Sequence, residues 1–140
     1  MKTNFDINEF AFYNEIICRL IFDFKISSQT KLIFISYSVK NIAHDFKSTS
    51  QKYGTYEIIM GGIKKDLQQN ISQFCMIFEC IEILKKQNYI RVDGETIKIL
   101  NSPTISKTID CLDSPLLKNA IMETEKLSTE SLLRGVVEYV

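Results

Sequence analysis

Three long segments in which apolar residues recur every three or four positions dominate this chain of 140 residues. They cover residues 8–23, 29–46 and 70–87, and such spacing predicts amphipathic α-helices. The apolar residues include Phe12, Ile16, Leu20 and Phe24 in the first segment, Leu32, Ile35, Val39, Ile42 and Phe46 in the second, and Ile71, Phe74, Phe78, Ile81 and Leu84 in the third. Apolar side chains extend around more than half of each predicted helix, so each needs cover on more than one side.

A β-hairpin is predicted directly after the third helix. Residues 89–92 and 96–100 alternate apolar with polar side chains, as half-buried strands do. The turn Asp93-Gly94-Glu95 between them contains an Asp-Gly pair, which tolerates positive φ. Helices followed at once by a two-stranded hairpin are typical of a winged-helix domain.

The rest of the chain predicts a loop and further helices. Residues 101–112 contain Pro103 and indicate a loop, after which Ser114-Pro115 supplies an N-cap and a proline at the first helical position. Ser128 begins a last helix, although residues 134–140 also fit a strand. We therefore predict an α+β, mostly α fold.

This fold divides into two parts. Residues 1–112 form a winged-helix-like helical domain with one β-hairpin. Residues 113–140 form a C-terminal helical extension that packs on this domain or on a partner.

Charge and hydropathy exclude some classes of protein. Lys and Arg number 17, as do Asp and Glu, and a formal charge of zero argues against a dedicated nucleic-acid binder. No apolar run approaches the roughly 18–20 residues that span a bilayer. The first residues lack the basic start and apolar stretch of a signal peptide. We expect a cytoplasmic protein with no membrane contact.

The residues that usually carry metal or acid–base chemistry are sparse. His44 is the one histidine, and it is expected at the polar end of a helix. Cys75 and Cys80 would lie about 140° apart on a helix, which prevents them from binding one metal ion together. The carboxylates are scattered singly. We predict no catalytic residue, no metal site and no cofactor, hence no enzyme.

A glycine pair precedes two lysines in the middle of the chain. Gly61-Gly62 is followed by Lys64 and Lys65, but the sequence has no phosphate-binding glycine motif. The pattern therefore predicts a turn with solvated lysines.

A winged-helix regulator that binds DNA is the alternative function. Its recognition helix would be residues 70–87, but the middle of this segment is apolar, and Glu79 and Glu82 would repel phosphates. Contacts with the DNA backbone alone remain open. Their candidate residues are Lys64, Lys65, Arg91 and Lys98.

Two stretches of the chain resemble a known family. The residues FAFYNE at Phe10–Glu15, the apolar helix after them, and LKKQNYIRVDG at Leu84–Gly94 are similar to small middle components of bacterial three-component ABC-ATPase systems. Among these components, the stretches resemble the small subunit of Lamassu-like antiphage defence systems. The resemblance covers residues 8–100 and implies a noncatalytic adaptor. Its partners would be an SMC-like coiled-coil ATPase and an effector subunit, often a nuclease, with DNA contact mainly on the ATPase.

The apolar excess of the three helices leads to the same expectation. A domain of this size should not bury all of their apolar faces, and exposed apolar patches usually mark partner surfaces. The alternative is that the helices simply bury one another.

Overall fold

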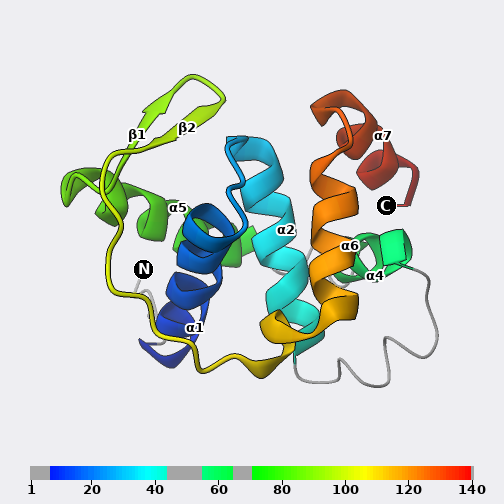
Figure 1. Cartoon of the computed structure of the whole chain (residues 1–140). Coiled ribbons are helices and arrows are strands. Elements are labelled where there is room, and N and C mark those ends of the chain that lie inside the picture. The colour runs from blue at the N-terminus through cyan, green and yellow to red at the C-terminus, as the bar shows by residue number, and fades with distance from the viewer. Residues whose placement is uncertain (1–6, 44–54, 65–70, 140) are drawn as a thin grey trace.

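The computed structural model describes residues 7–43, 55–64 and 71–139 (Figure 1). Within these residues the fold is α+β and mostly α, with one antiparallel β-hairpin and a helical C-terminal part. The helices are α1 (Ile7–Cys18), η1 (Arg19–Asp23), α2 (Gln29–Ile42), α4 (Thr55–Lys64), α5 (Ile71–Lys86), η3 (Asp110–Asp113), α6 (Pro115–Glu125) and α7 (Thr129–Tyr139). The strands are β1 (Ile90–Asp93) and β2 (Thr96–Ile99). The predicted fold class is confirmed.

The first predicted helix is present, but its last turn is wider than an α-helix. Residues Arg19–Asp23 form the π-helix η1, and the backbone N–H of Phe24 donates to the carbonyl of Arg19 at 3.0 Å, five residues earlier. The wider turn changes the direction in which the following side chains point. Lys25, just after it, has a φ of 60°.

Helix α2 lies in the middle of the molecule, between α1 and α6 (Figure 1). It begins as predicted, because the Ser28 side chain caps it and accepts a hydrogen bond from the Lys31 backbone N–H at 3.2 Å. The residues that face its neighbours, among them Leu32, Ile35 and Val39, are fully buried. The predicted end of this helix, at residues 44–46, lies outside the described residues.

The predicted turn at Gly61-Gly62 is wrong, because α4 continues through both glycines. A Cβ added to Gly62 would stand 2.8 Å from the Ser38 carbonyl oxygen, so only glycine fits there. The Ser38 hydroxyl donates to the Ile59 carbonyl at 2.6 Å, and the Asn41 amide donates to the Gly62 carbonyl at 3.0 Å. The glycine therefore allows the close approach of α2 and α4 instead of a change in chain direction.

The hairpin follows α5, as predicted. Ile90 pairs with Ile99, and Asp93 pairs with Thr96, which leaves Gly94 and Glu95 as the loop. Gly94 has a φ of 59°, in the region that favours glycine.

The hairpin also pairs with the chain just before α2. The backbone N–H of Ile97 donates to the carbonyl of Ser27 at 2.7 Å, and the backbone N–H of Gln29 donates to the carbonyl of Glu95 at 2.8 Å. The resulting bridge between Ser28 and Thr96 fixes the hairpin against the start of α2.

The C-terminal helices complete the core on the other side of α2. Ser114 and Ser128 precede α6 and α7 as predicted, and α7 continues as a helix to Tyr139. Both helices pack against α4 and α2 (Figure 1). Leu117, Ala120, Ile121 and Leu132 are fully buried in this contact region.

The expectation that this domain cannot cover its helices is wrong for the first two. Tyr13, Ile16, Ile17, Leu20 and Ile21 of the first helical segment are all fully buried. Helix α4 and the C-terminal helices supply cover that the sequence pattern does not indicate. Among the described residues of the three predicted segments, Phe78 of α5 is a large apolar side chain that stays exposed, and Ile7, just before the first segment, is exposed as well.

Candidate interaction surface

The outer face of α5 combines apolar and acidic side chains. Cys75, Phe78, Glu79 and Glu82 follow one another at helical spacing, and all are exposed. Phe78 has 48% of its surface exposed, although it lies in the middle of the helix. Lys85 forms an ion pair with Glu82 at 2.9 Å and holds the pKa of that carboxyl below its ordinary value. We call these four residues, Cys75, Phe78, Glu79 and Glu82, the α5 face.

The inner side of α5 packs against α1 and α2, which holds the helix in place. Ile77 and Cys80 are fully buried, and the Phe74 ring stacks on Tyr37 of α2 with 4.8 Å between ring centroids. The Tyr13 hydroxyl of α1 donates to Gln73, which ties α5 to α1 as well. The α5 face thus lies on a helix whose opposite side is packed against α1 and α2.

The predicted nucleic-acid contacts do not form one group. Arg91 and Lys98 are directly opposite each other on the hairpin, and both are exposed. Asp93 lies 3.1 Å from Arg91 and 3.4 Å from Lys98, so it offsets part of their charge. Lys64 ends α4, which lies on the opposite side of the molecule from the hairpin (Figure 1). Lys65 lies outside the described residues.

A long segment connects the hairpin to η3 and passes along α1 (Figure 1). Glu15 of α1, which is only 6% exposed, binds this segment with both carboxylate oxygens. One oxygen accepts from the backbone N–H groups of Thr108 and Ile109 at 2.9 and 2.7 Å, and the other accepts from the Thr108 hydroxyl at 2.6 Å. Three donors therefore replace the water that this carboxylate loses on burial.

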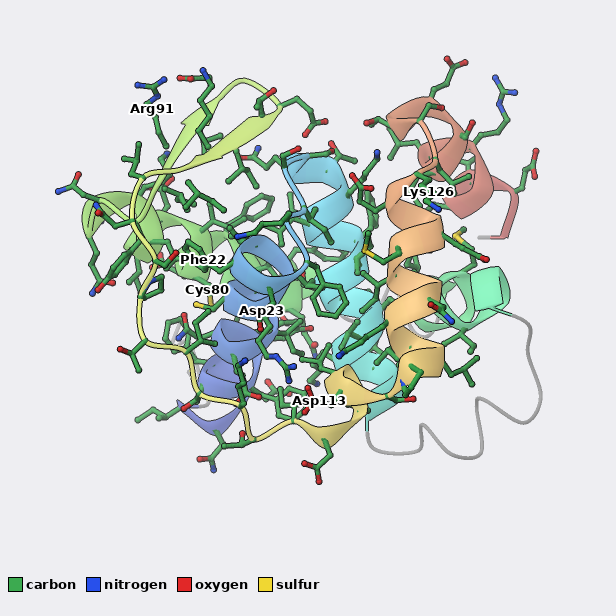
Figure 2. All side chains as sticks on the ribbon, in the orientation of Figure 1. Phe22, Asp23, Cys80, Arg91, Asp113 and Lys126 are labelled. Carbon is green, nitrogen blue, oxygen red and sulfur yellow. The ribbon has the colours of Figure 1, made fainter. Side chains whose placement is uncertain are left out.

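Arg19, one turn after Glu15, fixes the end of the same segment. Its guanidinium is almost fully buried, and it donates to the Ile109 carbonyl at 3.3 Å and to Asp113 at 2.6 Å. Asp23 accepts a third contact at 3.5 Å. In Figure 2, Asp23 lies above Asp113. The sequence analysis does not identify this polar contact, because nothing in a single sequence pairs Glu15 and Arg19 with residues about 90 positions later.

Two hollows border the connecting segment. They measure about 410 and 370 Å³, and they share Asn14, Cys18 and Thr104 among their linings. Burial raises the pKa of the Cys18 thiol to about 11, so this thiol stays protonated at neutral pH and is a poor nucleophile. Besides Glu15 and Arg19, the buried side chains of Ile109 and Leu112 hold the end of this segment in place.

The cysteines of α5 do not come together at one site. Cys75 is exposed and Cys80 is buried on the same helix, so they face different surroundings. In the described part of the chain no group of His, Cys, Asp and Glu side chains is arranged to hold a metal ion. His44 lies outside that part. No helix among the described residues is long and apolar enough to cross a membrane.

Comparison of the chain with protein-family models, with curated proteins and with solved structures finds no match.

Proposed function

We propose that this chain is a noncatalytic adaptor subunit of a bacterial antiviral defence complex. In that role it binds an SMC-like coiled-coil ATPase and an effector subunit, in the cytoplasm, and reaches DNA only through the complex. The family resemblance of residues 8–100 suggests the kind of complex. The observation that carries the adaptor role is the α5 face, where Phe78 stays exposed on a helix whose opposite side is buried.

The chemistry of the α5 face favours a protein over DNA. A helix that reads the major groove presents Arg, Lys, Asn or Gln to the bases. The α5 face presents Phe78 with Glu79 and Glu82, and phosphates would repel these carboxylates. An aromatic side chain with a charged rim is the usual composition of a protein–protein contact.

The adjacent cations Arg91 and Lys98 support the alternative, a winged-helix transcription regulator. Asp93 between them and the absence of a third described cation on the hairpin weaken this candidate. The two functions predict different results for the same variants.

Co-expression with the products of the neighbouring reading frames tests the adaptor role. We expect co-purification with an SMC-like ATPase, and we expect Phe78→Asp to abolish it. Val137→Asp is the matched control, because it introduces the same charge at an exposed apolar residue on α7. Both changes concern exposed side chains, so each should alter the free energy of unfolding by only about 1 kcal/mol.

A different outcome would reverse the assignment. Salt-dependent, site-specific DNA binding by the isolated chain, lost on Arg91→Glu with Lys98→Glu, would favour the regulator. In the adaptor role the same double variant leaves complex assembly largely intact.

A further inference from the structure

The hairpin leaves one edge of strand β1 without a neighbour. Strand β2 lies between β1 and the Ser27–Gln29 segment, which bonds to Ile97 and Glu95. Among the described residues no segment pairs with the other edge of β1. Such an edge is a template for a further strand.

The register shows which backbone groups face this edge. In an antiparallel ladder successive residues point their N–H and C=O groups to opposite sides. Leu100 donates to Tyr89 at 2.8 Å, in register with the pairs of the hairpin, so the backbone of Tyr89 faces β2. Arg91 and Asp93 follow at intervals of two and face β2 as well. The backbone groups of Ile90 and Val92 therefore point outward, but Ile90 is only 2% exposed, so the open part of this edge is at Val92.

The charges along β1 are complementary to their own copy. Arg91 and Asp93 flank Val92, and both side chains lie on the outer, solvent-exposed side of the hairpin. We infer that two copies of this chain associate edge to edge through β1, antiparallel, about a twofold axis at Val92. The N–H of each Val92 donates to the carbonyl of the other, and Arg91 of each copy stands opposite Asp93 of the second copy.

Neighbouring registers are excluded by backbone direction or by charge. A shift by one residue places the outward backbone groups of one copy opposite backbone groups of the other copy that point toward its own β2, so no hydrogen-bonded ladder forms. Of the two nearest registers that keep the ladder, one places Arg91 opposite Arg91, and the other places Asp93 opposite Asp93. Directly opposed like charges destabilise a strand pair, whereas opposite charges stabilise it. The register about Val92 is the one in which every opposed charge is matched.

The tip of the hairpin is open. Gly94, at the tip of the hairpin, has no atom within 4 Å of the position that a Cβ would occupy. In the register about Val92 this residue lies opposite Ile90 of the second copy. The contact involves a single short strand from each copy, so we expect a weak, concentration-dependent dimer. This inference goes beyond the adaptor role and does not depend on it.

Sedimentation of the full chain across a range of concentrations tests the inference. We expect the wild type to pass from monomer to dimer. Asp93→Arg and Arg91→Asp each bring like charges together twice in the dimer, so each should raise the dissociation constant at least roughly tenfold. An equimolar mixture of these two variants should form a heterodimer, because one chain then carries arginine at both positions and meets a chain that carries aspartate at both.

Two further variants separate edge pairing from damage to the fold. Val92→Pro removes an outward N–H without removing a bond of the β1–β2 ladder, and it should abolish the dimer while circular dichroism stays unchanged. Lys118→Glu on α6 is the charge control and should leave the dimer intact. A wild type that stays monomeric at every concentration overturns the inference. A dimer that survives Asp93→Arg, or a mixture that fails to associate, also overturns it.

Discussion

At the scale of single residues, the unusual feature is a pair of buried charges one turn apart on α1. Glu15 satisfies its carboxylate with three donors from the connecting segment, and Arg19 binds a carbonyl and two carboxylates. Burial of charge without such partners is costly. The pair therefore helps to hold residues 108–113 against α1, together with the buried side chains of Ile109 and Leu112.

Asp113 should make folding sensitive to acid. Hydrogen bonding to Arg19 holds the pKa of its carboxyl below the ordinary value in the folded chain. A lowered folded pKa adds stability that is present above the unfolded pKa, about 3.9, and is lost as the pH falls through the folded value. Asp113→Asn should therefore unfold more easily than the wild type at pH 7, and the difference should close in acid.

Denaturant unfolding at several pH values measures this difference. Asp110→Asn is the control, since Asp110 is an exposed carboxyl three residues earlier in the same turn of 3-10 helix. A difference between Asp113→Asn and the wild type that is the same at pH 7 and pH 3 would contradict the role of the Arg19 contact.

At the scale of helices and strands, local signals predict most elements correctly. The helix starts and the hairpin turn depend on a few neighbouring residues. The helices begin after Ser28, Ser114 and Ser128, and the turn contains Asp93-Gly94. The prediction of a turn at Gly61-Gly62 is wrong, because Gly62 lets α4 approach Ser38 of α2, a residue that is distant in sequence. Helix pairing of this kind leaves no periodic signal in a single sequence.

The glycine pair of α4 offers a matched test of that pairing. Gly61 has open space where a Cβ would stand, whereas Gly62 abuts Ser38 and Ile42. Gly61→Ala should stabilise the chain by about 0.4–1 kcal/mol, because alanine loses less conformational freedom in a helix. Gly62→Ala should destabilise it by roughly 1–3 kcal/mol, because α2 and α4 must move apart.

Thermal or denaturant unfolding of both variants checks the prediction. Equal shifts in the same direction would show that α2 and α4 do not approach closely at Gly62.

At the scale of the whole molecule, α2 joins two groups of helices. Helices α1 and α5 lie on one side of it, and α4, α6 and α7 lie on the other (Figure 1). The candidate site is only partly predictable at this scale. The sequence pattern identifies the apolar and acidic residues of α5, but which of them stay exposed depends on distant elements such as α1 and α2.

The cysteines should report on the integrity of this arrangement. Cys75 is exposed on the α5 face and should react with a thiol reagent in the native protein. Cys18 and Cys80 are buried, which raises their pKa values to about 11 and 12, and Cys80 lies fully inside the core. Cys80 should react only when the molecule opens, so its labelling rate should follow the free energy of unfolding, whereas Cys18 borders the two hollows and is not enclosed to the same degree.

Mass spectrometry after timed labelling distinguishes the sites. Rapid modification of Cys80 in the native chain would contradict the packing of α1 against α5. Gly62→Ala should accelerate the labelling of Cys80 while leaving Cys75 unaffected.

The bonds from Glu15 to Thr108 and Ile109 join residues 93 and 94 positions apart in the chain. During synthesis the N-terminal helix leaves the ribosome long before the segment that donates these hydrogen bonds exists. The carboxylate must then stay hydrated, which opposes burial of that side of α1. We expect nascent chains that end before Thr108 to remain open around α1, and compaction there to follow only when the C-terminal third has emerged.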